Sequence, residues 1–324
     1  MSFEQIEDCF NCSYRRRPAR HGMLYWQVPE DKGAGEIRAC PMMEGFWLIF
    51  SDYCLQPGKE AVMEAHSEDI VLIQHVLEGG GYLIGEDDKT AIFRKGETLY
   101  FSGDFRYDRS GTLEEGLSAV SIFIEREKFD RTLKESFLLQ DEEMQPFRRR
   151  FASAEEIIIA SYNPLLYEKA AELKLLIQEE QCLKVRLEGL ELLRLDGDFY
   201  LHKRKGSKRF YPEEYVNKVK DVADYMKDNP EERLCLNDLS TDFSINKTYL
   251  KEIFQELYGM PPMRYFWDIR LQRGRELLEA GFPVLEVALR VGYDNPSKFT
   301  AAFKKKYGYL PSHAAKHKKL QQKD

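Results

Sequence analysis

The sequence has few of the features that mark membrane-spanning, secreted or metal-dependent proteins. No run of about 18 apolar residues occurs among its 324 residues, so we expect no membrane span. The first residues are acidic and contain no apolar segment of the kind that directs secretion, which predicts a cytoplasmic protein. Six cysteines are present, and only Cys9 and Cys12 have a Cys-x-x-Cys spacing. Because no second pair completes a zinc tetrahedron, we expect reduced thiols and no bound metal.

Basic residues are in the minority overall, with 48 Lys and Arg against 55 Asp and Glu, but they are unevenly distributed. Residues 203–324 hold 24 basic and 17 acidic side chains, so their balance is +7. This leaves 24 basic and 38 acidic side chains for the other 202 residues, a balance of −14. Phosphate groups respond to the local field rather than to the charge of the whole chain. An acidic body with a basic C-terminal module is typical of a regulator rather than of a histone-like coat protein.

A β-rich pattern covers residues 45–125, whereas residues 1–45 show no periodicity and are expected to be irregular. Segments of branched and aromatic residues alternate there with turn signals, such as the three glycines at 79–81. Short strands at this spacing favour a β-sandwich or a small barrel. The stretch 75–101 resembles the strand–turn repeat of a cupin-like jelly roll. We therefore assign residues 1–150 to a cupin-like β domain that also contains helices. We expect this domain to sense an effector.

The cupin resemblance raises the alternative of a metal enzyme, which needs clustered ligands, typically a His-x-His pair with a later acid and His. No His-x-His pair occurs, and His66 and His75 lie nine positions apart. His75 falls in the apolar run VLIQHVL, where a hydrogen-bonded core histidine is the favoured interpretation. We therefore predict a ligand pocket without catalytic residues, metal or other cofactor. The effector-binding residues are not identified by the sequence, although four aromatic side chains could line such a pocket: Trp47, Tyr82, Tyr100 and Phe101.

Between residues 151 and 200 the period becomes helical. Apolar residues from Leu166 to Leu193 recur at spacings of three, four or seven. This stripe has two interpretations that can coexist: it packs against the β domain, or it forms a helix pair between the subunits of a homodimer. The next residues, 201–211, surround a Gly-Ser pair with lysine and arginine, which predicts a solvated linker.

The clearest signal is a pair of similar segments near the C-terminus. Four residues of the first segment recur 49 positions later in the second: Phe254, Tyr258, Gly259 and Pro262 match Phe303, Tyr307, Gly308 and Pro311. Each segment has the pattern of two short helices joined by a tight turn, with glycine as a C-cap. Such a duplicated helix-turn-helix pattern predicts DNA binding. A long helix over about 264–280 would hold the two units at a fixed separation.

In a helix-turn-helix unit, the exposed N-terminal half of the second helix meets the base edges. Asn can bond adenine in a bidentate way, and Lys can reach guanine or phosphate. In the first unit, at 236–257, the candidates are Asn246, Lys247, Tyr249 and Lys251. In the second unit, at 284–307, they are Asn295, Ser297, Lys298 and Thr300 for the groove, and Lys304, Lys305 and Lys306 for phosphates. The alternative for these last three lysines is a solvated helix face.

The C-terminal segment resembles the AraC/XylS family of bacterial transcription regulators from about Tyr215 to Ala315. The pattern comprises Tyr265, Arg270-Leu271, Leu277-Leu278, Val287-Ala288, Val291-Gly292-Tyr293, Phe299, Phe303-Lys304, Gly308 and Pro311. The resemblance implies an all-α double helix-turn-helix domain, which we place at 212–320, and regulation of transcription from promoter DNA. Two positions depart from the family pattern, since Glu252 and Ala301 stand where the family often has basic residues. The lysines of the second unit are therefore expected mainly to position the protein.

The sequence as a whole predicts an α+β multidomain protein that acts as a sequence-specific DNA-binding transcription regulator, favoured as an effector-responsive activator. Its expected partners are double-stranded promoter DNA, RNA polymerase and a second copy of the chain, with a small-molecule effector as an open option and no membrane. A DNA-repair methyltransferase is disfavoured because no zinc-bound cysteine cluster is present. An architectural DNA-binding protein is disfavoured because it would not need an acidic β domain. The effector, the promoter, the sign of regulation and the permanence of the dimer are not determined by the sequence.

Overall fold

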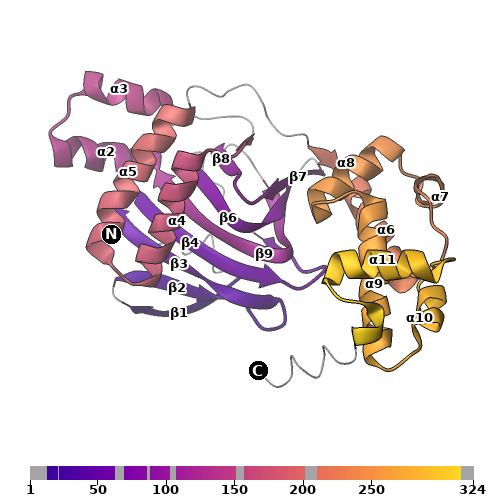
Figure 1. The fold of residues 1–324 in the computed structure, drawn as a ribbon. Coiled ribbons are helices and arrows are strands. Elements are labelled where there is room, and N and C mark those ends of the chain that lie inside the picture. Colours follow the sequence, from indigo (N-terminus) through magenta and orange to yellow (C-terminus); the bar gives the residue numbers. More distant parts are fainter. Residues whose placement is uncertain are drawn as a thin grey trace. The chain divides into compact units, whose positions relative to one another are not determined.

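The computed structural model describes residues 13–20, 22–62, 69–85, 88–102, 107–150, 157–200 and 210–314. The chain divides into two compact units, Met1–Pro212 and Glu213–Asp324, which can be followed by colour along the sequence in Figure 1. Cys9, Cys12, His66 and residues 201–209 of the predicted linker lie outside the described residues. Within the described part of the chain, no helix is long and apolar enough to cross a membrane.

The first unit is an antiparallel β-sheet domain covered by helices (Figure 1). Its strands are β1 (Arg15–Arg20), β2 (Met23–Gln27), β3 (Gly33–Met43), β4 (Phe46–Leu55), β5 (Ala61–Val62), β6 (Ile70–Gly85), β7 (Lys89–Arg94), β8 (Thr98–Ser102), β9 (Tyr107–Glu125), β10 (Ile158–Ala160) and β11 (Tyr211–Pro212). The main path through the sheet is β1-β2-β3-β4-β9-β6-β7-β11, and β5, β8 and β10 pair off this path. An N-terminal β domain followed by an all-α domain, as the sequence predicted, is confirmed.

Two long strands, β6 of 16 residues and β9 of 19 residues, pair with each other in this sheet, so the prediction of only short strands is wrong. The glycines at 79–81, predicted as a turn, lie inside β6, where its register on β9 shifts. Gly79 has a φ of 64°, and a Cβ atom there would lie 2.0 Å from the carbonyl oxygen of Gly116. The glycines therefore form a β-bulge within one continuous strand, and a run of glycines alone does not distinguish such a bulge from a chain reversal.

The prediction that residues 1–45 are irregular is wrong for their described part. Strands β1, β2 and β3 extend the sheet beyond β4, and β3 pairs with β4 from Gly33 opposite Leu55 to Met43 opposite Phe46. β1 is rich in arginine, and β3 contains two glycines and a proline, so neither strand alternates apolar and polar residues. Their strand structure is imposed by pairing with a neighbour rather than by local propensity.

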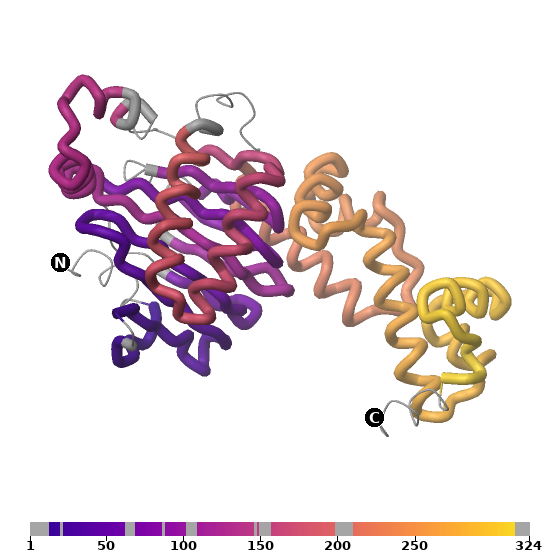
Figure 2. Tube along the Cα trace, turned by 60° about the vertical axis from the view of Figure 1, so that its left-hand side comes forward, coloured from indigo at the N-terminus to yellow at the C-terminus, as the bar shows by residue number. Residues whose placement is uncertain are grey.

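The helices of the first unit are α2 (Arg126–Phe137), α3 (Asp141–Arg150), α4 (Pro164–Gln178) and α5 (Cys182–Tyr200). α4 and α5 lie side by side over one face of the sheet (Figures 1 and 2). Leu173 of α4 and Leu192 of α5 join a core cluster with Phe50 of β4, so part of the predicted stripe packs against the β domain. Leu183 and Leu187 are instead 73% and 61% exposed, so this part of the stripe is not buried against the described residues of the β domain.

His75 of β6 is buried and hydrogen-bonded, which confirms the interpretation of it as a core histidine. Its Nε2 atom lies 2.9 Å from Oδ2 of Asp196 in α5, and its Nδ1 atom lies 3.1 Å from the Thr98 hydroxyl. The Tyr100 hydroxyl donates to the other carboxylate oxygen of Asp196 at 3.0 Å. These contacts fix α5 to β6 and β8. In the described ranges, no group of three or more His, Cys, Asp and Glu side chains could hold a metal ion.

The aromatic residues considered for an effector pocket do not gather at one place. Trp47, Tyr100 and Phe101 belong to three different clusters of the buried core. The hydroxyl of Tyr82 donates to a carboxylate oxygen of Glu60 at 3.3 Å. These side chains therefore serve the packing of the domain at separate positions.

The second unit is all-helical in its described part (Figure 2). Its helices are α6 (Glu213–Asp228), α7 (Leu236–Asp242), α8 (Lys247–Tyr258), α9 (Pro262–Glu279), α10 (Val284–Arg290), α11 (Pro296–Tyr307) and the 3-10 helix η1 (Pro311–His313). α9 contacts α6, α8, α10 and α11, and its buried residues lie at the centre of this unit. The predicted order of helix pair, long helix and helix pair is therefore present.

Candidate nucleic-acid interface

Helices α7 and α8 form the first helix-turn-helix unit, and local sequence explains its turn and helix ends. Ser244 in the turn has a φ of 48°, a left-handed conformation that is uncommon for a residue other than glycine. The side-chain oxygen of Asn246 accepts the backbone N–H of Thr248 at 2.7 Å and so caps the start of α8. At the other end Gly259, with a φ of 71°, is a left-handed C-cap. The helix that carries the predicted base-reading residues therefore has both ends fixed.

Helices α10 and α11 repeat this arrangement. Asn295 accepts the backbone N–H of Ser297 at 2.8 Å and caps α11, and Gly308, with a φ of 81°, is its C-cap. α8 and α11 are both 12 residues long. The turns differ, because four residues (243–246) join α7 to α8 whereas five (291–295) join α10 to α11. Gly292, with a φ of 76°, takes up the left-handed conformation in the longer turn.

The long helix α9 joins the two helix-turn-helix units through Arg270, a charged residue that lies in the interior of the domain. Arg270 is only 4% exposed. Its guanidinium donates to the carbonyl oxygens of Pro230 at 2.8 Å and Gly292 at 3.2 Å, and also to that of Glu232. Burial lowers the pKa of this guanidinium, while the ring of Phe266 lies 4.3 Å from its Cζ atom. Arg270 therefore attaches both the loop after α6 and the turn of the second helix-turn-helix unit to helix α9.

The spacing of residues in α9 contained a signal for this role. Phe266, Arg270, Gly274 and Leu278 recur every four residues, and all four are buried. Such a spacing places them on one face of a helix. A Cβ atom on Gly274 would lie 2.9 Å from the Phe299 ring, so glycine allows α11 to approach α9 closely. Arg270 therefore lies on the buried stripe of α9 despite its charge.

The candidate DNA-contacting residues of the first helix-turn-helix unit lie together at the start of α8. Asn246, Lys247, Tyr249 and Lys251 are all exposed. Lys247 and Lys251 are four residues apart and therefore share a face of the helix. Tyr249 is 37% exposed, and the centre of its ring lies 5.1 Å from that of Tyr215 in α6. Because Asn246 caps the helix through its side-chain oxygen, a bidentate contact with adenine would compete with that cap.

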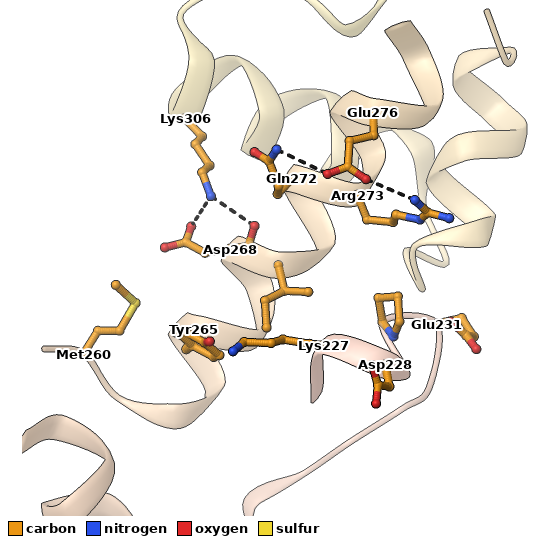
Figure 3. Close-up of a pocket in the computed structure, with 12 residues that line it drawn as sticks. Lys227, Asp228, Glu231, Met260, Tyr265, Asp268, Gln272, Arg273, Glu276 and Lys306 are labelled. Atoms are coloured by element: carbon orange, nitrogen blue, oxygen red, sulfur yellow. Dashed lines mark hydrogen bonds and ion pairs between the residues drawn. The ribbon is translucent and has the colours of Figure 1, made fainter. Parts of the chain in front are cut away.

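The candidate DNA-contacting residues of the second helix-turn-helix unit lie along α11. Ser297, Lys298, Lys304 and Lys305 are exposed, Thr300 is half-buried, and Asn295 is the N-cap. Lys306 differs from its neighbours because its Nζ atom lies 3.0 Å from both the carboxylate and the backbone oxygen of Asp268 in α9 (Figure 3). A phosphate contact by Lys306 would have to compete with this ion pair. Lys304 and Lys305 are therefore better placed to meet phosphates.

An open groove with a volume of about 730 Å³ lies beside this ion pair, lined by residues from the end of α6, from α9 and from α11 (Figure 3). Its charged side chains are largely paired with one another, as Lys306 is with Asp268 and as Arg273 is with Glu276 at 3.0 Å. Because both signs of charge are present, the groove does not concentrate a field for an anionic ligand. We assign it no ligand.

The structure thus brings the predicted residues together in two sets, one on α8 and one on α11. Two of them, Asn246 and Asn295, have a capping role that explains their presence without DNA. The contacts with bases and phosphates that the sequence assigned to these sets remain predictions.

Residues 239–317 match the protein-family model of a helix-turn-helix domain. Over 181 residues the chain is 24% identical to VirF, a virulence regulon transcriptional activator of Yersinia enterocolitica, and the match covers 53% of this chain and 64% of VirF. Over 84 residues it is 27% identical to the transcriptional regulator ExsA of Pseudomonas aeruginosa, covering 26% of this chain and 30% of ExsA. The C-terminal domain of AraT, a response regulator from Geobacillus stearothermophilus, is similar over 31% of this chain and 84% of its own, with 26% identity and a TM-score of 0.30.

The chain spans less than two thirds of the length of these curated relatives. The assignment of the domain therefore rests on the family match and on the repeated helices, turns and caps of the second unit.

Proposed function

We propose that this chain, whose second unit contains a helix-turn-helix domain of the AraC type, is a sequence-specific transcription regulator that binds promoter DNA through both helix-turn-helix units. The observation that carries the proposal is the duplication. Two second helices of equal length, each with an Asn N-cap and a Gly C-cap, present exposed polar residues and are held by one central helix. Fixed separation of two such helices suits insertion into successive turns of a major groove.

Dimerisation through α4 and α5 is the arrangement that we propose for the first unit. Four large apolar side chains are exposed on these helices: Leu165 (56%), Leu175 (58%), Leu183 (73%) and Leu187 (61%). A two-fold pair of such helices would remove this apolar surface from water and is a common interface in homodimers. A dimer would also present two DNA-binding units to one promoter.

We further propose that the first unit binds a small-molecule effector and that the bound protein contacts RNA polymerase in the bacterial cytoplasm, where promoter DNA is found. The name of VirF as a transcriptional activator supports activation rather than repression. An effector would act only if it bound one arrangement of the protein more tightly than another.

The test is selection of fragments of the source genome by the purified chain, followed by transcription of the selected fragments in vitro with bacterial RNA polymerase. We expect enrichment of a common sequence upstream of a promoter, and more transcript when the protein is present. A matched fragment with a scrambled site controls for unspecific binding. Enrichment of fragments without any common sequence would contradict the proposal and favour an architectural role.

A further inference from the structure

The turn of each helix-turn-helix unit contains one residue in the left-handed conformation. In the first unit it is Ser244, with a φ of 48°, and in the second it is Gly292, with a φ of 76°. This conformation carries no steric penalty for glycine, whereas the Cβ atom of serine makes it unfavourable. Such a residue keeps its conformation only where the surrounding contacts determine it. The first turn therefore depends more than the second on contacts from outside the turn.

In both units, the carbonyl oxygen of this left-handed residue accepts a hydrogen bond from a basic side chain of the helix that precedes the unit. Arg270 of α9 donates to the carbonyl oxygen of Gly292 at 3.2 Å. The Nζ atom of Lys218 in α6 donates to the carbonyl oxygen of Ser244 at 3.3 Å. In chain order, α6 precedes α7 and α8 as α9 precedes α10 and α11. The duplication thus extends from the helices, turns and caps to a cation that binds each turn.

The two cations hold their turns with different strength. Arg270 is buried and donates to three carbonyl oxygens. The side chain of Lys218 is 26% exposed, donates to one carbonyl oxygen and forms an ion pair with Glu214 one turn earlier in α6. A partly exposed lysine with one such bond contributes less to folding than a buried guanidinium with three. We therefore expect the loss of Lys218 to change the first turn while the domain stays folded.

The start of α6 also contacts the exposed start of α8. The centre of the Tyr215 ring lies 5.1 Å from that of Tyr249, and the Lys218 ammonium lies 5.5 Å from the centre of the Tyr215 ring. α8 begins at Lys247, three residues after Ser244, so the turn sets where this helix starts. Lys218 and Tyr215 together support both the turn and the helix that carries the candidate base-reading residues.

From these contacts we propose that Lys218 is a positioning residue of the first helix-turn-helix unit, which acts through the carbonyl of Ser244 to hold α8 in the orientation that reads bases. This inference rests on the proposed function, because it concerns how one of the two units selects its sequence. The Lys218 ammonium is engaged by Ser244 and Glu214 and does not bind phosphate. Its loss therefore weakens base contacts at the start of α8 and leaves the attraction to phosphates in place.

Four variants of the full chain test this role. Lys218→Met keeps most of the aliphatic stem and removes the donor, whereas Lys218→Arg keeps a donor and the charge. Ser244→Gly removes the penalty of the left-handed conformation, so the turn needs less support from Lys218. It is tested alone and together with Lys218→Met. Lys227→Met is the matched control, because Lys227 lies at the other end of the same helix and pairs with Asp224 at 3.3 Å.

The readouts are the ratio of affinities for a selected fragment and for its scrambled version, and the slope of log affinity against log salt. For Lys218→Met we expect the ratio to fall about fivefold, because base contacts carry the discrimination. The slope should change by less than about 0.5, since each lost phosphate contact changes it by about 1. Lys218→Arg, Ser244→Gly and Lys227→Met should keep the ratio within about twofold of the wild type. The double variant should regain at least about half of the lost selectivity on a logarithmic scale.

Two results would overturn the positioning role. An equal loss of affinity for specific and for scrambled DNA in Lys218→Met, with a slope lower by about 1, would show that Lys218 itself contacts a phosphate. An unchanged ratio in Lys218→Met would show that the bond to Ser244 does not serve base selection. In both cases the wild type would still prefer the selected fragment, so the proposed function would stand. Absence of that preference in the wild type would instead overturn the proposed function itself.

Discussion

The two halves of the second unit, residues 213–261 and 262–314, share a similar helix-turn-helix arrangement but differ in the sign of their net charge. Residues 213–261 hold 6 basic and 11 acidic side chains, a balance of −5, whereas residues 262–314 hold 9 basic and 5 acidic, a balance of +4. α8 carries two lysines and two glutamates, and α11 carries four lysines and no acid. We therefore propose that the second half attracts phosphates of any sequence, and that the first half depends on specific contacts with bases for its affinity. The charge difference predicts that α11 positions the protein on DNA and that α8 selects the bases.

The largest expected effect concerns the residue that couples the two halves. Arg270→Ala would leave three part-buried carbonyl oxygens without their donor and open a cavity beside Phe266, so we expect the unfolding free energy of the second unit to fall by about 3 kcal/mol. Hydrogen exchange of peptides from both units, measured in a urea series, would localise the loss to residues 213–314. Arg273→Ala on the exposed side of the same helix is the control and should cost no more than about 0.5 kcal/mol. An equal effect of the two changes would show that Arg270 does not couple the halves.

The next effect tests positioning by α11. Removing both Lys304 and Lys305 by substitution with Ala should lower the slope of log affinity against log salt by about 2, and weaken binding about 30-fold at physiological salt. The loss should be similar for specific and scrambled DNA. Lys306→Ala should weaken binding less than about threefold, because its ammonium is already paired with Asp268. Anisotropy titrations in a salt series measure both quantities, and a larger effect of Lys306 would contradict the assignment.

Base selection by α8 is tested with Lys247→Ala. If Lys247 meets a base edge, the ratio of specific to scrambled affinity should fall about tenfold. Gln255→Ala, an exposed position two turns further along α8, is the control and should leave that ratio unchanged. An equal loss of affinity for specific and for scrambled DNA would show that Lys247 contacts phosphates rather than bases. The two halves would then not differ in their roles.

The smallest effect separates capping from recognition at Asn246. Asn246→Ala removes the N-cap of α8 and should lower the unfolding free energy by about 1 kcal/mol, whereas Asn246→Ser keeps a capping oxygen and should cost less. Both variants lack the amide, so a base contact by Asn246 would reduce selectivity in both. If only the alanine variant binds less selectively, Asn246 supports selectivity by capping the start of α8 and not by contacting a base. Urea unfolding and DNA titration of the same samples give the two readouts.

The parts of the fold that sequence predicted are those governed by local rules. Gly259 and Gly308 end α8 and α11 as the predicted C-caps, and the structure adds that Asn246 and Asn295, predicted as groove residues, cap the starts of these helices. Their exposed residues follow from the same period, so the candidate set could be named before the structure. What these residues touch in DNA depends on a partner that the chain alone does not specify.

The parts that sequence did not predict depend on contacts between distant residues. The glycines at 79–81 have the composition of a turn, and only their pairing with β9 makes them a bulge. β1 becomes a strand because β2 is beside it. Arg270 lies on the buried face of α9, and its burial is tolerated because carbonyl oxygens from two separate loops converge on it. A charged residue on a buried helical stripe is the pattern that would have revealed it.

The most direct test of the account is a footprint of the purified chain on a fragment selected from its own genome. We predict two protected blocks whose centres lie about one helical turn, or about 10 base pairs, apart. In the variant lacking Lys304 and Lys305, both blocks should fade together as salt is raised, whereas in Lys247→Ala the block under the first unit should lose its sequence preference first. A single block, or protection without sequence preference, would contradict the claim that both helix-turn-helix units bind promoter DNA.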